Sequence, residues 1–366
     1  MLVQRPASHS VRPISMQVKI PAHQESKLAW FGPELQSDTD KWVLQLDDAE
    51  IAEVEIAARK IIEQDRSIVE INKENFPLPL LGSRLEELTE QLINGIGFAL
   101  VRRIPVQRYS VEQAATMFYG VGAHLGNARM QNAKGHVLGH VCDLNMHSDE
   151  PGVRIYQTHE RQTFHTDSSD IVGLLCLKKA KKGGESLLVS AVTIYNEMLK
   201  TRPDLVRLLF DPIATDRRGE IPEGMQPFFS IPVFSWEQEH LTVMYQRQYI
   251  DSAQSFDDAM RLTSEHVQAL DKFDEFANDP DLNMSMQLEP GDMQFVYNHG
   301  LLHDRTGFED WQDIEDRRHL LRLWLSAPND RPLPAVFKER FGSIEIGNRG
   351  GITVQGAEPC APMEPS

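Results

Sequence analysis

The sequence predicts a mainly β protein with flanking helices. From residue 126 onward, short segments rich in β-branched and aromatic residues alternate with turns of Gly, Pro and charged residues, a texture typical of a β-sandwich or barrel. The first 125 residues show helical periodicity instead. No internal repeat and no low-complexity linker divides the 366 residues, so we expect one large domain.

Periodicity and capping signals define the individual elements. Apolar residues three and four positions apart predict a helix over 47–66, a capping box of Ser83 and Glu86 opens a second helix that ends at Gly95, and a third covers 111–125. The following region adds helices at 192–200 and 263–278 to a series of strands. The predicted strands are 97–101, 153–157, 171–177, 186–189, 241–245, 293–297 and 319–325.

The chain is expected to contain a single domain with two terminal extensions. Residues 1–25 are predicted to be a flexible N-terminal arm, and 346–366 a Gly- and Pro-rich tail with little to bury. The domain between them, 26–345, divides into a helical part (26–95) and a β-rich part (96–345).

Charge and cysteine content exclude several classes of protein. A net charge of −17 argues against a surface that neutralises phosphates or an anionic membrane. Three scattered cysteines suit a reducing cytoplasm, and the longest apolar run, 171–177, is far shorter than a membrane span. We therefore expect a cytoplasmic protein without nucleic-acid or membrane partners. The basic, acid-free first 24 residues leave a mitochondrial presequence as a weak alternative.

The first chemical motif is Phe164-His165-Thr166-Asp167. On an extended segment, residues two apart project from the same face, so His165 and Asp167 can meet one cation. A His and an Asp at this spacing are also common as a simple surface pair.

The second motif lies at residues 290–305, where a Pro-Gly-Asp turn leads into an apolar strand that ends in several histidines. His299 and His303 both qualify as a third metal ligand. Arg318 and Arg322 then interrupt a strand that otherwise reads as core, which is unfavourable without an anionic partner. That partner could be a bound ligand or an acidic side chain such as Asp167 or Glu309, and an edge position facing water is a further alternative.

Together these residues suit a 2-His-1-carboxylate iron site. Three protein ligands on one face leave three positions open, which a chelating 2-oxo acid and dioxygen can fill. The remote carboxylate of a dicarboxylic keto acid then needs a bidentate cation, which Arg provides better than Lys.

The sequence resembles the iron(II)- and 2-oxoglutarate-dependent dioxygenases of the taurine dioxygenase (TauD/TfdA) type, within the clavaminate synthase-like superfamily. The resemblance spans roughly residues 95–345. The matching stretches are FHTDSSDIVGLLCLKKAKKGGESLLVS (164–190), LEPGDMQFVYNHGLLHDRTGFED (288–310) and RRHLLRLWL (317–325). The resemblance implies a double-stranded β-helix (jelly-roll) core that forms the catalytic part of the chain.

The resemblance also implies a role for each matching residue. His165, Asp167 and His303, rather than His299, match the family's iron ligands. Arg322 matches the arginine that clamps the distal carboxylate of 2-oxoglutarate, and Arg318 matches one near the iron-chelating end. Ser186 stands where the family usually has threonine, so the hydroxyl is kept and the methyl is lost.

The implied activity couples oxidative decarboxylation of 2-oxoglutarate, giving succinate and CO2, to C–H oxidation of a small polar organic substrate. Hydroxylation is the usual outcome. The implied cofactors are Fe(II), 2-oxoglutarate and O2, and no separate acid or base residue is expected. Two alternatives are a zinc-dependent hydrolase with the same three ligands and a non-catalytic β-barrel binding protein.

Substrate contacts are expected near the mouth of the site, in the loop 125–144 and just before the first ligand. The candidates are Asn127, Arg129, Gln131, Asn132, Tyr156 and Gln162, with Tyr245, Arg247 and Tyr249 as weaker ones on a β segment. The loop polar residues could equally be solvated surface groups. Relatives often form dimers or tetramers, so a homo-oligomer is possible.

Overall fold

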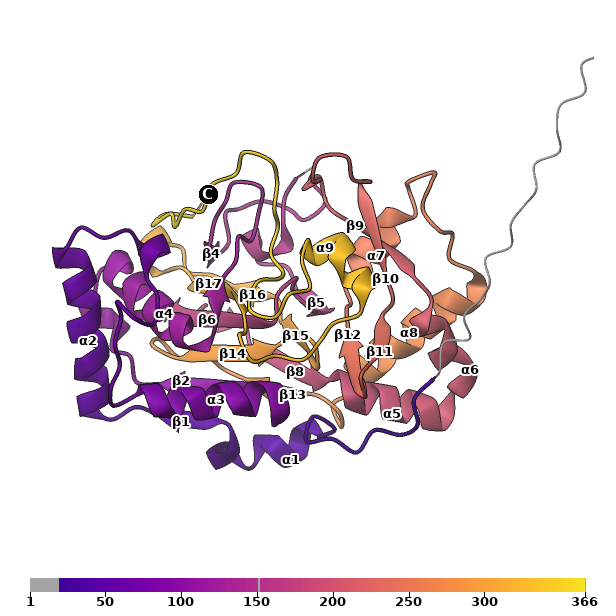
Figure 1. The fold of residues 1–366 in the computed structure, drawn as a ribbon, viewed down its shortest axis with the longest axis horizontal. Coiled ribbons are helices and arrows are strands. Elements are labelled where there is room, and N and C mark those ends of the chain that lie inside the picture. The colour runs from indigo at the N-terminus through magenta and orange to yellow at the C-terminus, as the bar shows by residue number, and fades with distance from the viewer. Residues whose placement is uncertain (1–19, 151, 366) are drawn as a thin grey trace, which may run out of the picture.

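The computed structural model describes residues 20–150 and 152–365, and two β-sheets form its centre (Figure 1). The larger sheet has the order β1-β2-β14-β6-β17-β3, with β4 also paired to β17, and the smaller has the order β13-β8-β15-β5. The larger sheet contains β1 (Val43–Gln45), β2 (Phe98–Arg102), β3 (Asn127–Ala128), β4 (Leu138–Val141), β6 (Ile171–Lys178), β14 (Met293–Tyr297) and β17 (His319–Ser326). The smaller contains β5 (Gln162–His165), β8 (Ser186–Ser190), β13 (Met284–Met286) and β15 (Leu301–Arg305). The expected jelly-roll core with flanking helices is confirmed.

Three helices cover one face of the larger sheet: α2 (Asp48–Glu63), α3 (Gly82–Asn94) and α4 (Val111–Leu125). Alternation along β17 explains how one strand serves two layers. Leu321, Leu323 and Leu325 join the core shared with these helices, whereas Leu320 and Trp324 belong to the core on the other face. Arg322 shares the second face and is buried between the sheets.

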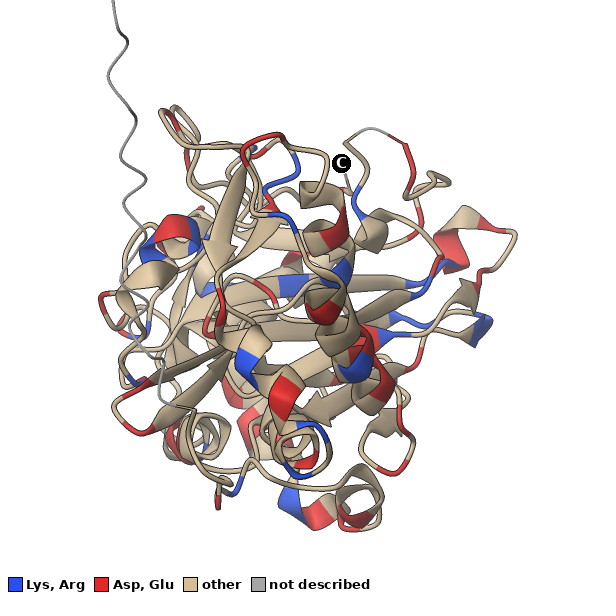
Figure 2. Ribbon diagram, turned by 90° about the vertical axis from the view of Figure 1, so that its right-hand side faces the viewer, with Lys and Arg blue, Asp and Glu red and all other residues tan. Residues whose placement is uncertain are grey.

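The remaining elements lie around the smaller sheet. Helices α5 (Ala191–Thr201), α6 (Pro203–Val206) and α8 (Ser264–Ala277) contribute to the core below it. Other short elements complete the molecule: α1 (Gly32–Gln36), α7 (Arg247–Ala253), α9 (Lys338–Phe341), and the paired strands β7 (Lys182–Gly183) with β16 (Phe308–Glu309), β9 (Ile213–Asp216) with β10 (Phe228–Ile231), and β11 (Phe234–Glu237) with β12 (His240–Val243). Acidic and basic residues are interspersed over the ribbon in Figure 2. In the part of the chain that the structure describes, no helix combines the length and apolar character that a membrane crossing requires.

Most predicted elements are present, but three local predictions were wrong. Ser83 and Glu86 do not cap α3, whose N-cap is Leu81 without a side-chain cap; the Glu53 carboxylate from α2 accepts hydrogen bonds from the backbone N–H groups of Leu80 and Leu81 instead (2.8 and 3.0 Å). The predicted strand at 153–157 is a 3-10 turn, Ile155–Gln157. Arg247 and Tyr249 lie on α7, not on a strand.

Both ends of the described chain are attached to the domain. The predicted N-terminal arm lies mostly outside the described residues, but Gln24 N–H donates to the Asn196 side chain of α5 (2.8 Å). At the other end, the backbone N–H of Val137 donates to Cys360 (2.9 Å), and Ile352 is buried. The C-terminal segment therefore buries more than expected. The division at residues 25, 95 and 345 stays a prediction.

A buried ion network attaches the C-terminal segment, through Arg349, to Asp170 and Asp330. The Arg349 guanidinium contacts Asp170 (Nε–Oδ1 2.8 Å) and Asp330 (Nη2–Oδ2 2.6 Å), and all three side chains are fully buried. His299 also lies 2.8 Å from Asp170. Burial alone would raise the pKa of Asp170. The hydrogen bonds from His299 and Arg349 nevertheless hold this pKa below its ordinary value.

Arg349→Met is expected to lower the free energy of unfolding by about 3–5 kcal/mol, because it leaves two buried carboxylates without their shared cation. Urea denaturation followed by circular dichroism measures this change. Arg59→Met on the exposed side of α2 is the matched control and should change stability by less than about 0.5 kcal/mol. A similarly small loss for Arg349→Met would show that the network does not stabilise the fold.

Candidate active site

Three buried side chains meet where the smaller sheet faces β17. His165 ends β5, Asp167 follows two residues later, and His303 lies on β15 opposite His165 in the strand pairing. One ligand atom from each lies within 4.8 Å of the others. Nε2 of His303 is 3.7 Å from Asp167 Oδ2, and Nε2 of His165 is 4.0 Å from Oδ1. Two imidazoles and one carboxylate are the donor types of a 2-His-1-carboxylate metal site.

The protonation states of the three residues suit a cation. Burial, with His165 as a second cause, lowers the pKa of His303 to about 3, and burial also lowers the pKa of His165. Burial opposes ionisation of Asp167, but Arg322, His303 and His165 together hold its pKa below the ordinary value. The site therefore offers two neutral imidazoles and one carboxylate, which are the forms that ligate a metal.

Neighbouring groups orient these ligands. His165 Nδ1 lies 2.8 Å from the carbonyl of Thr163, which leaves Nε2 as the free lone pair. The Trp324 indole N–H donates to Asp167 Oδ2 (2.8 Å). The Gln162 amide lies 2.8 Å from His165 Nε2, so Gln162 must turn away when a metal binds there.

Trp324→Phe is expected to weaken iron(II) binding roughly 10- to 100-fold, because hydrogen bonds to a metal's carboxylate ligand fix its orientation. Titration with iron(II) under anaerobic conditions measures the affinity. Trp311→Phe changes an exposed tryptophan and should leave affinity unchanged. Equal affinities for both variants would exclude an orienting role for Trp324.

His299, the other candidate ligand, belongs to the separate cluster with Asp170 and Asp330. The guanidinium of Arg349 fills the centre of that cluster, where a metal ion would need to lie. The spatial arrangement therefore favours His303 over His299 as the third ligand.

The two arginines lie in the reverse of the expected order relative to the metal ligands. Arg322 Nη1 is 3.8 Å from Asp167 Oδ2, and its Nε donates to Gln131 Oε1 (2.7 Å). Its guanidinium also lies 4.6 Å from the Tyr156 ring centroid. A keto acid chelated at one end would carry its other carboxylate away from the metal ligands, and the position of Arg322 beside Asp167 suits the chelating end better.

Arg318 lies farther along the same cavity. This cavity is lined by His165, Asp167, His303, Arg322, Ser186 and Arg318. Arg318 Nη1 is buried and, among the described residues, has no hydrogen-bond partner. Burial lowers the pKa of Arg318 to about 10, the behaviour of a cation that lacks an anion. Ser186 donates its hydroxyl to Gln294 Oε1 (2.9 Å).

The structure divides the predicted substrate residues into two groups. Gln131, Tyr156 and Gln162 line the cavities beside the metal ligands. Asn127 and Arg129 instead donate to the C-terminal segment, at Gly347 (2.8 Å) and Asn348 (3.0 Å) respectively, and Asn132 accepts from N–H groups within its own turn. Asn127, Arg129 and Asn132 therefore do not line the cavities beside the metal ligands. Their positions in the sequence could not show which side of the loop points inward.

Two polar residues of the site were missed from the sequence. A second cavity adjoins His165 and Asp167, and Arg154 and Arg340 line it, whereas Arg318 lines only the first. Neither lies in a recognisable motif, and each reaches the site from a loop or a one-turn helix. Tyr245, one of the weaker substrate candidates, is fully buried, and its hydroxyl donates to Asp274 (2.6 Å) rather than into the site.

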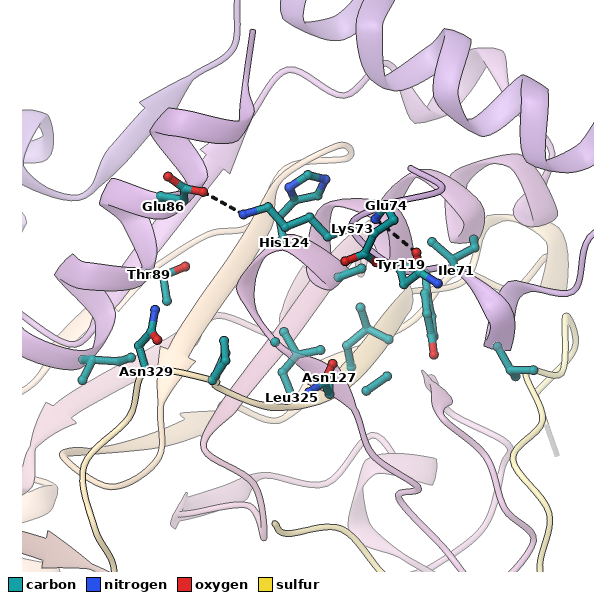
Figure 3. A pocket seen from close by; sticks show the side chains of 18 of the residues that line it. Ile71, Lys73, Glu74, Glu86, Thr89, Tyr119, His124, Asn127, Leu325 and Asn329 are labelled. Carbon is teal, nitrogen blue, oxygen red and sulfur yellow. Dashed lines mark hydrogen bonds and ion pairs between the residues drawn. The ribbon is translucent and has the colours of Figure 1, made fainter. Parts of the chain in front are cut away.

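A separate pocket, distinct from the two cavities beside the metal ligands, lies on the other face of β17, between the helical layer and the larger sheet (Figure 3). Lys73, Glu86, His124 and Asn329 are among its lining residues, and Lys73 is paired with Glu86 (2.7 Å). Leu323 and Leu325 separate it from Arg322 and Trp324. None of the predicted metal or cosubstrate residues lines it, so it is not the site of the chemistry.

Comparison with known families agrees with this geometry. The family model described as "Taurine catabolism dioxygenase TauD, TfdA family" matches residues 64–324. The chain belongs to this family. The match begins directly after α2 and therefore includes all of α3 and α4.

Individual relatives cover most of this TauD/TfdA protein. FR-33289 synthase of Streptomyces rubellomurinus is 35% identical over 312 residues, or 83% of this chain and 91% of the relative. Taurine hydroxylase-like protein SAT17 of Stachybotrys chartarum is 31% identical over 316 residues, or 84% and 80% of the two chains.

Solved structures show the same fold. Asparagine oxygenase in complex with Fe(II), hydroxyasparagine and succinate superposes with a TM-score of 0.62 at 18% identity, covering 78% of this chain and 93% of that one. The non-heme iron oxygenase OrfP with Fe and alpha-ketoglutaric acid gives 0.56 at 14% identity, covering 77% and 93%. The TauD/TfdA protein thus shares its architecture with iron oxygenases.

Proposed function

We propose that this TauD/TfdA dioxygenase binds iron(II) through His165, Asp167 and His303, with 2-oxoglutarate and O2 as cosubstrates. The observation that carries the proposal is the buried cluster of two neutral imidazoles and one ionised carboxylate beside two buried arginines. Zinc hydrolysis with the same three ligands would leave the buried guanidinium of Arg318 without an anion.

The arrangement of the arginines supports one orientation of the cosubstrate. Arg318 holds the distal carboxylate, Ser186 lines the same cavity with its hydroxyl turned to Gln294, and Arg322 lies beside the chelating end, next to Asp167. A bidentate arginine is well matched to a carboxylate. Gln131 keeps the Arg322 side chain in place through its amide oxygen. These roles exchange those expected from the sequence.

Iron(II) and 2-oxoglutarate, when bound, supply the oxidative chemistry: keto acid, O2 and a substrate C–H group give succinate, CO2 and a hydroxylated product. The protein's own residues orient the groups and exclude water. Trp324 fixes the Asp167 carboxylate, and Gln162 leaves the ligand position of His165. Because no general acid or base is needed, the other residues of the cavity are free to select the substrate.

The substrate in this proposal is a small polar organic molecule. The second cavity adjoins His165 and Asp167 and combines polar residues with Phe229, Met244 and Ile352. The fold neighbours named above were solved with hydroxyasparagine or alpha-ketoglutaric acid, and two further relatives are named uridine-5′-phosphate dioxygenases. These names are consistent with a polar substrate.

The proposal is tested by a substrate screen in which succinate release is measured with iron(II), 2-oxoglutarate and air. Some succinate should form even without a productive substrate, through uncoupled turnover, and a true substrate should increase it. Zinc-dependent hydrolysis without any succinate would overturn the proposal.

A further inference from the structure

The second cavity contains charged residues besides the metal ligands. It is lined by His165 and Asp167, by the apolar residues Phe229, Met244 and Ile352, and by Arg154, Glu220, Tyr249 and Arg340. A substrate placed there would have its oxidised carbon near the metal and its far end against these charged residues.

Arg154 is fully engaged by neighbouring protein groups. Its guanidinium is ion-paired with Glu220 and donates to the Tyr249 hydroxyl (Nη1–Oη 3.0 Å). The Tyr249 ring also lies 5.6 Å from the guanidinium carbon of Arg218. Arg154 and Glu220 therefore form a closed pair that shapes the wall and contributes little net charge.

Arg340, by contrast, lacks a counter-ion. Its Nε donates to Ser168 Oγ (2.8 Å), and its guanidinium carbon lies 5.4 Å from the Phe229 ring centroid. Among the residues that the structure describes, no carboxylate lies within ion-pair distance of this guanidinium. The pKa of Arg340 is lowered to about 10, mainly by burial; Glu220 opposes this shift, and the nearby Arg154 and Arg217 add to it.

The other acidic groups of the cavity are already paired. Asp216 accepts from Ser252 Oγ and from the backbone N–H of Arg218 (both 2.7 Å). Asp167 belongs to the metal ligands, and Glu220 belongs to Arg154. Of the three arginines that line the cavity, Arg154 is paired with Glu220 and Arg322 lies 3.8 Å from Asp167, whereas Arg340 has no carboxylate of the described residues within ion-pair distance. A half-buried guanidinium without a counter-ion is stabilised by an anion that enters with the ligand.

We propose that Arg340 binds an oxyanion group of the substrate, such as a carboxylate, sulfonate, phosphonate or phosphate, and so determines which molecules enter the cavity. This inference rests on the proposed function, because it names the substrate class of the same site. The apolar residues of the same cavity, Phe229, Met244 and Ile352, hold the carbon part of the substrate.

The test uses the full chain without metal or 2-oxoglutarate, titrated calorimetrically with small oxyanions and their neutral analogues. Acetate is compared with acetamide, and methanesulfonate with dimethyl sulfone. We expect binding of at least one oxyanion and of neither neutral analogue. Arg340→Gln should weaken oxyanion binding roughly 10- to 100-fold, and Arg340→Lys should keep part of it.

Three further variants separate this site from its alternatives. Arg59→Gln removes an exposed arginine of α2 and should leave binding unchanged. Arg318→Gln removes the proposed 2-oxoglutarate clamp and should also leave the Arg340-dependent binding in place. Circular dichroism confirms that Arg340→Gln is folded, and if it is not, the Arg340→Lys titration decides.

Equal oxyanion affinity in wild type and Arg340→Gln would overturn the inference, as would binding lost only in Arg318→Gln or no oxyanion binding at all. Because the titration needs neither metal nor cosubstrate, its outcome is independent of whether succinate is formed. Failure of the dioxygenase proposal would therefore appear as absent succinate with Arg340-dependent oxyanion binding intact.

Discussion

His303→Ala abolishes succinate formation and weakens iron(II) binding by more than roughly 100-fold in our account, because it removes one of only three protein ligands. Asp167→Ala has the same effect and also leaves the Trp324 indole N–H without its acceptor. Anaerobic iron(II) titration measures binding, and succinate is quantified after exposure to air.

Two histidine variants are the controls for this prediction. His23→Ala changes an exposed residue and should retain both iron binding and turnover. His299→Ala disturbs the Asp170 network and should lower stability while the folded fraction still binds iron. If turnover survived in His303→Ala and iron binding were lost in folded His299→Ala, the third ligand would be His299.

Arg318→Gln is expected to weaken 2-oxoglutarate binding by about 2–5 kcal/mol, at least roughly 30-fold, because the distal carboxylate would be buried without its cation. Iron(II) affinity should stay nearly unchanged, since Arg318 does not contact the metal ligands. Both affinities are measured under anaerobic conditions, iron(II) alone first and 2-oxoglutarate with iron(II) second.

Arg322→Gln provides the contrast. Arg322 lies 3.8 Å from Asp167 and is the main neighbouring charge that favours its ionised form. Its loss should weaken iron(II) and 2-oxoglutarate binding together. If Arg322→Gln affected only 2-oxoglutarate and Arg318→Gln affected neither ligand, the arginine roles would be those first expected from the sequence.

Sequence patterns predicted the elements that depend on local signals. The helix at 111–125 and the strand at 293–297 match the structure because each is defined by its own periodicity and flanking turns. The predicted cap of α3 was wrong because a side chain distant in sequence, Glu53, accepts the backbone N–H hydrogen bond at the start of this helix. Tertiary partners of this kind leave no mark on the neighbouring sequence.

The cluster of His165, Asp167 and His303 could be predicted because their spacing and flanking residues form motifs, and the structure brings the three side chains together; that they bind a metal stays a prediction. The order of Arg318 and Arg322 could not, because both lie on one strand and only the position of Asp167 shows which is nearer the metal. Arg340 was missed for a related reason: its importance comes from the absence of a nearby carboxylate, which only the folded arrangement reveals.

The most direct measurement is the anaerobic addition of 2-oxoglutarate to the protein loaded with iron(II), followed by air. A weak visible charge-transfer band should form, and succinate should accumulate once oxygen enters; Asp167→Ala should give neither. A folded, iron-loaded protein that shows no band and no succinate would contradict the account.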